Sequence, residues 1–117
     1  MDKNILSRID FLLKQIERIE NDVANKTYEE FAQSDLLVRA TSFSIMQVGE
    51  QLNRLYDKIG QQYPNIPWKK AIGMRNVIVH VYAKVDAKQV YKVATEDVLD
   101  IKDEFISIRN DLTNNIN

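Results

Sequence analysis

The chain has 117 residues with a formal net charge of −1, and 44% of them are apolar and 28% charged, which is the balance of a globular domain. It has no cysteine and one histidine. These counts exclude a disulfide framework, a thiolate metal site and a cage of several histidines within one chain. Three glycines and two prolines are too few for the many turns of a β-sandwich or barrel.

We therefore expect a single all-α domain over residues 1–117. No stretch of the sequence approaches the roughly 20 apolar residues that span a membrane. The first four residues open into an amphipathic pattern and lack the basic leader and apolar core of a secretory signal. The expected location is cytoplasmic, with no membrane partner.

Charge is distributed unevenly along the chain. Residues 68–92 carry six basic side chains against one aspartate, a local net charge of +5, and the segments on both sides are acidic. A nearly neutral net charge argues against a protein that coats nucleic acid without regard to sequence. The basic segment is compatible with a phosphate-handling site, and a solvated lysine face is the alternative.

A first amphipathic helix is predicted over residues 2–25, with Asp2 as its N-cap. Its apolar residues recur at steps of three and four and form one stripe. The stripe consists of Ile5, Leu6, Ile9, Leu12, Leu13, Ile16, Ile19 and Val23.

A second helix is predicted over residues 34–59, with Ser34 as its N-cap and Gly60 as its C′ residue. Apolar residues occupy an unusually wide part of its circumference. Such a helix is either the centre of a bundle or faces a second chain.

Residues 61–67 contain both prolines and are predicted to form the main loop, after which Trp68 opens a short helix. Residues 77–79 are β-branched and would suit a strand. We reject that strand because the sequence offers it no partner.

Asp86 is the predicted N-cap of a further helix, and Thr95 is predicted to cap or restart the last one. The last helix carries a seam that steps by three and four, as in a heptad pattern. The chain as a whole predicts an up-and-down bundle of four or five helices. The seam consists of Val98, Ile101, Phe105, Ile108 and Leu112.

The side chains that could take part in catalysis or binding gather in residues 73–82. There, Arg75, Asn76, His80 and Tyr82 interrupt an apolar run. Polar groups among buried residues are costly unless they are paired. Arg75 and His80 would stand about 140° apart on a regular helix, so we expect the helix to end or distort near His80. A buried histidine beside a structural arginine is the alternative.

These residue types suit cleavage of RNA without a metal. RNA carries its own nucleophile, the 2′-hydroxyl. A histidine can move a proton near neutral pH, and an arginine fork can hold the charge that builds on the phosphate. Asn76 could bind a phosphate oxygen or orient His80. The sequence has no carboxylate cluster or metal-binding motif that would point to a resident metal.

The Arg75–His80 spacing resembles the R-x4–6-H motif of HEPN domains. The resemblance is closest to the HepT group, whose R-x4-H-x-Y motif is matched by Arg75, His80 and Tyr82. Its flanking landmarks follow in order, and the one departure is Val81, where the family usually has an aromatic residue or glycine. These landmarks are Val48-Gly49-Glu50, Ile66-Pro67-Trp68, Gly73-Met74-Arg75-Asn76, His80-Val81-Tyr82 and Val85-Asp86.

The resemblance implies a helical HEPN bundle that pairs as a homodimer, with Arg75 and His80 in one cleft at the two-fold axis. It implies a ribonuclease toxin with no cofactor. It also implies a partner, an MNT-type nucleotidyltransferase antitoxin (MntA-like), which transfers AMP from ATP to Tyr82 and silences the toxin. The alternative is a non-catalytic helical subunit that docks a nucleotidyltransferase and presents RNA or nucleotide to it.

A dimer would also supply two imidazoles, one for each proton transfer of the cleavage. Lys84 and Lys88 are candidate contacts for RNA phosphates. Glu50 is either a partner of Arg75 or a surface acid. Trp68 and Tyr63 either stack on bases or anchor the core and the loop.

Overall fold

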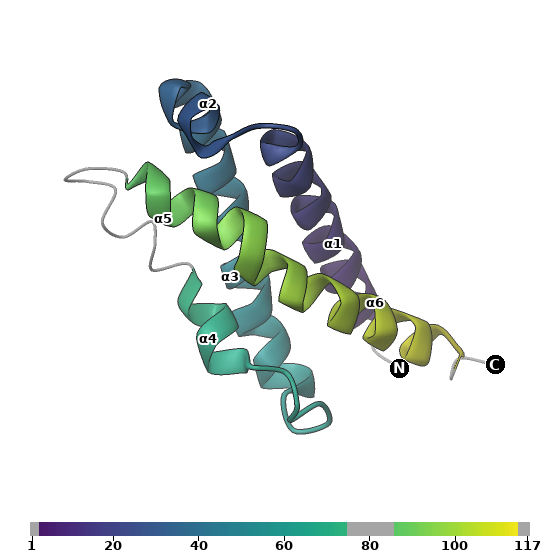
Figure 1. Cartoon of the computed structure of the whole chain (residues 1–117). Coiled ribbons are helices and arrows are strands. Elements are labelled where there is room, and N and C mark those ends of the chain that lie inside the picture. Colours follow the sequence, from purple (N-terminus) through teal and green to yellow (C-terminus); the bar gives the residue numbers. More distant parts are fainter. Residues whose placement is uncertain (1–2, 75–85, 115–117) are drawn as a thin grey trace.

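The computed structural model describes residues 3–74 and 86–114, and Figure 1 shows them as an assembly of helices. No strand occurs in these two ranges. In chain order the elements are α1 (Lys3–Val23), α2 (Tyr28–Gln33), α3 (Asp35–Ile59), α4 (Trp68–Gly73), α5 (Ala87–Lys92), a π-helical turn η3 (Val93–Asp97) and α6 (Val98–Asn114). The predicted all-α bundle is confirmed.

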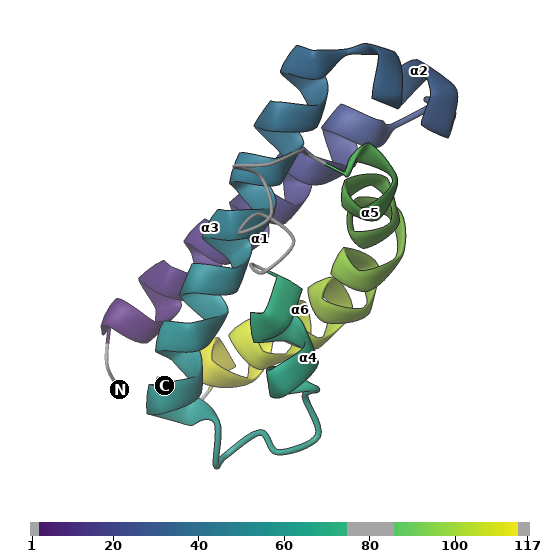
Figure 2. The same cartoon turned by 90° about the vertical axis from the view of Figure 1, so that its left-hand side faces the viewer.

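The antiparallel pair α1 and α3 forms the body of the bundle. Arg8 donates a hydrogen bond from Nη1 to Oε1 of Gln51 at 3.2 Å, and Thr41 donates to Oδ2 of Asp22 at 3.0 Å. The start of α1 therefore meets the second half of α3, and the end of α1 meets its first half. Helix α6 crosses this pair, and α1 begins where α6 ends (Figures 1 and 2).

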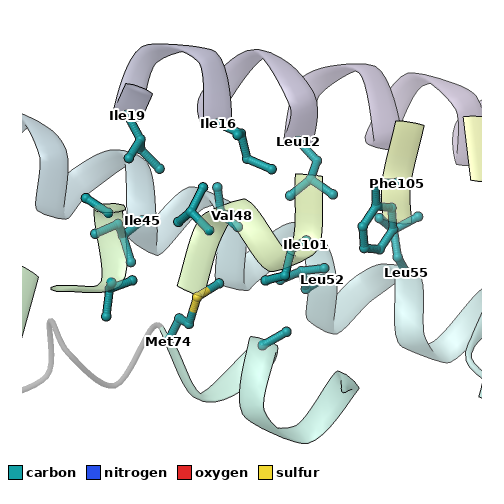
Figure 3. Close-up of a cluster of buried hydrophobic side chains, with 14 of the residues drawn as sticks. Leu12, Ile16, Ile19, Ile45, Val48, Leu52, Leu55, Met74, Ile101 and Phe105 are labelled. Atoms are coloured by element: carbon teal, nitrogen blue, oxygen red, sulfur yellow. The ribbon is translucent and has the colours of Figure 1, made fainter. Parts of the chain in front are cut away.

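The core lies where α1, α3 and α6 face one another. Figure 3 shows the side chains of the three helices converging on one layer, with Met74 closing it from the end of α4. Their spacing by three and four is the predicted stripe of each helix. The residues labelled there are Leu12, Ile16, Ile19, Ile45, Val48, Leu52, Leu55, Met74, Ile101 and Phe105, and each is buried.

Helix α3 is the central helix of the bundle, which is one of the two alternatives that its wide apolar belt left open. It packs against α1, α2, α4 and α5. Part of the belt is left over, since Leu36 is 73% and Phe43 57% exposed. No helix in the described ranges is both long enough and apolar enough to cross a membrane.

The predicted start of α3 is confirmed. Its end also lies at the predicted residue, but Gly60 does not have the backbone geometry that was predicted for it. Ser34 is the N-cap, and its hydroxyl accepts the amide of Leu37 at 3.1 Å. Gly60 follows the last residue of α3, but its φ of −56° is right-handed and not the left-handed C′ geometry. A Cβ at Gly60 would lie 2.6 Å from Cδ1 of Tyr56. The carbonyl oxygen of Tyr56 would lie closer still, at 2.5 Å, so glycine is favoured there because both the backbone and the ring of Tyr56 approach closely.

Helix α2 was not among the predicted helices. Its N-cap Thr27 accepts the amide of Glu30 at 3.2 Å, and the carboxylate of Glu30 accepts the amide of Thr27 at 3.0 Å. This reciprocal pair is a capping box, and Thr27-x-x-Glu30 is its sequence signature. Phe31 is the buried residue of this short helix.

The prediction that Thr95 caps or restarts the last helix is wrong. Helices α5 and α6 are joined without a break through η3, and the hydroxyl of Thr95 donates to the carbonyl of Tyr91 at 2.8 Å. Val93 and Ala94 are buried in the same turn. The chain stays helical because both must remain in the core, and the hydroxyl is satisfied inside the helix instead of capping a new one.

Candidate functional site

The predicted catalytic segment connects α4 to α5. Arg75, Asn76, His80, Tyr82 and Lys84 lie outside the described residues, which resume at residue 86. The expected distortion near His80 and the rejected strand at 77–79 fall in the same gap, as does the predicted N-cap Asp2 at the other end of the chain. The structure therefore describes the two helix ends that hold the segment.

The N-terminal side of the segment is anchored by Trp68, which opens α4. Only 6% of this residue is exposed, and its indole N–H donates to the carbonyl of Tyr63 at 2.9 Å. The ring makes an edge contact with Phe105 of α6 at 5.8 Å between centroids and a tilted contact with Tyr56 of α3 at 5.6 Å. One side chain thus ties α4 to a loop and to two helices.

The loop that leads into α4 has a second attachment. The hydroxyl of Tyr63 donates to Oδ2 of Asp111 in α6 at 2.8 Å. Burial raises the pKa of the Tyr63 phenol, and the Asp111 carboxylate raises it further. Of the two alternatives for Trp68 and Tyr63, these contacts support anchoring, and the buried ring of Trp68 is inaccessible to a nucleobase.

Met74 is the last residue before the segment. Its amide donates to the carbonyls of Ala71 and Ile72, which closes α4, and the residue is only 4% exposed. Figure 3 shows its side chain pointing toward Val48 and Leu52 of α3. Arg75 therefore follows directly on a residue that is fixed in the core.

Asp86 begins the C-terminal side of the segment. It is the predicted N-cap of α5, and its Oδ1 accepts the amides of Lys88 at 3.1 Å and Gln89 at 3.3 Å. Val90, one turn later, is fully buried. The prediction of Asp86 as a cap is confirmed, and the side chain of Lys88 is exposed, as a phosphate contact requires.

A small cleft lies between the two sides. Residues of α4 form one wall and residues of η3 and α6 the other, with about 20 Å³ of open volume, which is room for roughly one water molecule. A π-helical turn in this position is notable because such turns occur often at functional sites. The lining residues are Pro67, Lys70, Ala71, Met74, Asp97, Asp100 and Ile101.

Glu50, the other acid considered for the site, forms an ion pair with Arg54 one turn further along α3, at 3.4 Å. Its predicted pairing with Arg75 falls outside the described residues. Among residues 3–74 and 86–114, no group of three or more histidine, aspartate or glutamate side chains has a metal-binding arrangement.

Comparison with known proteins gives a consistent family match. The family model described as "HepT-like: Ribonuclease HepT-like" matches residues 12–108. A protein of Methanocaldococcus jannaschii named "Putative RNase MJ1216" is 32% identical over 101 residues, which are 86% of this chain and 84% of that protein. The "Probable ribonuclease HepT" of Thermococcus cleftensis is 26% identical over 105 residues, or 86% of this chain and 92% of that protein.

A third relative is longer than this chain. "Gamma-glutamylcyclotransferase and putative RNase MJ0434", also from Methanocaldococcus jannaschii, is 30% identical over 117 residues, and this chain spans 53% of its length. No solved structure matches the chain significantly.

Proposed function

Since this chain belongs to the HepT-like ribonuclease family, we propose that it is a metal-independent RNA endonuclease with Arg75 and His80 at its catalytic centre. The observation that carries the proposal is the order Arg75, Asn76, His80, Tyr82 in a chain whose family match surrounds it. The anchoring of the segment supports it as well. Met74 is buried on one side and Asp86 caps a helix on the other, and a reacting centre needs such fixed supports.

The chemistry is transfer of the phosphodiester to the neighbouring 2′-oxygen. A base takes the proton of the 2′-hydroxyl, the 2′-oxygen bonds to phosphorus, and the bond from phosphorus to the 5′-oxygen breaks. An acid returns a proton to the leaving 5′-oxygen. The products are a 2′,3′-cyclic phosphate and a 5′-hydroxyl, so atoms and protons balance without a metal or a cofactor. His80 carries the proton transfers, Arg75 binds the phosphate oxygens, and Asn76 donates to phosphate or orients His80.

Two proton transfers and one histidine per chain favour a homodimer with both segments in one cleft. The exposed apolar residues Leu36 and Phe43 on α3 are surface that such a dimer could bury. Lys84 and Lys88 would hold RNA phosphates beside the cleft.

We further propose that the protein is the toxin of a HEPN/MNT pair, silenced by its nucleotidyltransferase antitoxin. The phenol oxygen of Tyr82 would attack the α-phosphorus of ATP, and pyrophosphate would leave. The new phosphodiester carries negative charge and a nucleotide two residues beyond His80. It would occupy the Arg75 fork in place of RNA and block access.

The cleavage proposal is tested with the purified protein and an unlabelled RNA substrate. His80→Ala and Arg75→Ala should each lower cleavage at least 100-fold, with unchanged circular dichroism, while excess EDTA leaves the wild-type rate unaltered. Products should carry 2′,3′-cyclic phosphate or 3′-phosphate ends. A strict requirement for added Mg²⁺, or full activity in His80→Ala, contradicts the mechanism. A mixture of the two variants should recover activity that neither shows alone if the cleft is shared.

Silencing is tested by incubating the protein with the cognate nucleotidyltransferase and ATP. Mass spectrometry should show whole AMP units on the peptide that contains Tyr82, together with loss of cleavage. Tyr82→Phe should keep cleaving RNA and escape silencing. A label on Tyr56, Tyr63 or Tyr91 instead would overturn the switch.

A further inference from the structure

We propose that one side of α1 is a second RNA surface, which binds the phosphate backbone and a base of a single strand outside the catalytic segment. We call it the basic stripe, and it consists of Arg8, Phe11, Lys14 and Arg18. The identity of the ligand as RNA rests on the proposed function, whereas the binding chemistry rests on the residues described here.

The stripe is continuous on the helix. Its members follow one another at steps of three, three and four residues, which places them on one side of α1 within about 120° of its circumference. Lys14 and Arg18 are exposed, and Phe11 is 42% exposed. A large aromatic ring that is this exposed between basic residues offers an open face, and this arrangement suits a stacked base flanked by phosphates.

The charges of α1 are sorted between two sides. On the side toward α6, Arg109 donates from Nε to Oδ1 of Asp10, and Lys102 donates from Nζ to Oε2 of Glu20 at 3.0 Å. The Glu20 carboxylate raises the pKa of Lys102, and Glu17 adds to that effect. The acids of this side are therefore engaged with the cations of α6.

Another carboxylate lies beyond the stripe. Asp22, one turn after Arg18, accepts the hydroxyl of Thr41 at 3.0 Å. It marks the C-terminal limit of the stripe. Asp10 and Glu17 border the stripe at Lys14, and Asp10 is already paired with Arg109 of α6. With Asp10 paired, the three cations outnumber the acids beside them, and this side of α1 is complementary to a polyanion.

A cleft of about 260 Å³ opens at the N-terminal end of the stripe, between α1 and α3. Its lining offers a guanidinium, an aromatic ring, a hydroxyl and two amides, and no carboxylate. These groups match a phosphate and a base better than an apolar or cationic ligand. They belong to Asn4, Ser7, Arg8, Phe11 and Gln51.

Arg8 gives the strongest indication that the cleft binds a phosphate. Its Nη1 donates to Oε1 of Gln51 at 3.2 Å, which fixes the guanidinium against α3. Its Nε is buried and has no hydrogen-bond partner among the described residues. An unpaired buried donor is costly, and a phosphate oxygen becomes its acceptor once the groups that cover Nε move aside on binding. The guanidinium is thus positioned before any ligand binds.

The test measures binding of a fluorescein-labelled single-stranded RNA in which every ribose is 2′-O-methylated, so that no 2′-hydroxyl is present to react. Fluorescence anisotropy is followed at several salt concentrations. The double variant Lys14→Gln/Arg18→Gln should bind about 25-fold more weakly at 0.1 M salt. Its salt slope should fall by about 1.4, since each phosphate contact on a single strand contributes about 0.7.

The matched control is Lys102→Gln/Arg109→Gln, which removes the same two charges from the α6 side, where Glu20 and Asp10 already neutralise them. Its affinity should change by less than about threefold, and its salt slope should change by less than the value of about 0.7 that one phosphate contact contributes. Equal losses in both double variants would mean a response to net charge alone and would overturn the proposal, as would unchanged binding in both.

Phe11 gives an independent readout. Phe11→Ala should weaken binding roughly tenfold with an unchanged salt slope, because it removes stacking and no charge. Phe11→Tyr keeps the ring and should restore the affinity. Sedimentation of the stripe variants should match the wild type. If they change the association state and leave RNA binding intact, the stripe is a protein interface and the proposal is wrong.

The outcome is separable from the cleavage proposal. A wild-type protein that binds the methylated strand through the stripe but cleaves no unmodified RNA would sustain the stripe and refute the catalytic function. A protein that cleaves through His80 while all stripe variants bind as the wild type does would refute the stripe alone.

Discussion

The long helices of the bundle and the two six-residue helices on either side of residues 75–85 are held in place by different means. Helices α1, α3 and α6 have 21, 25 and 17 residues and pack along continuous apolar stripes. Helices α4 and α5 have six residues each, and isolated helices shorter than about 12 residues are marginal in water. Helix α4 therefore depends on individual side chains that attach it to the long helices, whereas α5 continues without a break through η3 into α6.

The two short helices also differ from each other. Helix α4 is attached through buried groups, the indole of Trp68 and the side chain of Met74. Helix α5 starts at the surface, where the carboxylate of Asp86 caps it. The predicted catalytic segment therefore follows a residue that is buried in the core and precedes a solvent-exposed cap. We expect different substitutions to loosen its two sides separately.

The largest expected effect comes from the long helices. Leu52→Ala should lower the free energy of unfolding by about 2–5 kcal/mol, since the leucine is 0% exposed and a cavity is left behind. Leu36→Ala, on the same helix but 73% exposed, should stay within about 0.5 kcal/mol. Urea denaturation measures both. Similar losses at the two positions would show that the core does not lie where α1, α3 and α6 meet.

A smaller effect is expected at the attachment of α4. Trp68→Phe removes the hydrogen bond to Tyr63 and part of the ring contacts, and should cost about 1–3 kcal/mol. Native-state hydrogen exchange should show faster opening of α4, at the amide of Met74, while amides in the middle of α1 follow only the global change. Equal acceleration in both helices would mean that Trp68 supports the whole core and not α4 in particular.

The long helices were predictable from sequence because their apolar spacing persists over several turns. Helix α2 was missed because six residues show no period, although Thr27 and Glu30 carry the capping signature. The end of α3 at Gly60 was placed correctly but for another reason, since Gly60 makes no left-handed turn and the close contact is with Tyr56, one turn earlier in the same helix. The role given to Thr95 was wrong because burial of its neighbours outweighed its capping preference.

The candidate site was predictable only in part. The catalytic residues remain a prediction from the resemblance to a family, whereas the flanking Trp68 and Asp86 were predicted from local signals that the structure bears out. The basic stripe escaped sequence reasoning because the polar side of an amphipathic helix is normally its solvent face. What sets Lys14 and Arg18 apart is that two acids of α1, Glu20 and Asp10, are engaged by Lys102 and Arg109. Those two cations lie more than 80 positions further along the chain.

The cap of α5 gives the next smaller effect. Asp86→Ala should cost about 1 kcal/mol and expose the amides of Lys88 and Gln89, which the carboxylate now accepts. Asp86→Asn is the matched control, because asparagine caps about as well as aspartate. Hydrogen exchange of those two amides should rise in the alanine variant and stay near wild type in the asparagine variant. A rise at Met74 as large as at Lys88 would contradict separate attachment of α4 and α5.

The smallest effect concerns α2, the other six-residue helix, and it depends on pH. The amide of Thr27 donates to the Glu30 carboxylate and holds the pKa of Glu30 below its ordinary value of 4.5, with the Thr27 hydroxyl as a second cause. A carboxylate whose pKa is lower in the folded than in the unfolded chain stabilises the fold at pH values above its unfolded-state pKa. This stabilisation is lost as the pH falls through its folded-state pKa.

Acidification from pH 6 to pH 3 should therefore lower the melting temperature of the wild type slightly more than that of Glu30→Gln. Glutamine keeps a side-chain acceptor for the Thr27 amide and completes the capping box without titrating, so the difference between the two proteins isolates the carboxylate. The two melting temperatures should converge as the pH falls through the pKa of Glu30 in the folded chain. Because Glu30 is fully exposed, added salt should reduce the difference as well. A difference that grows on acidification would mean that the carboxylate opposes the helix, and the short helix α2 would then depend on Phe31 alone.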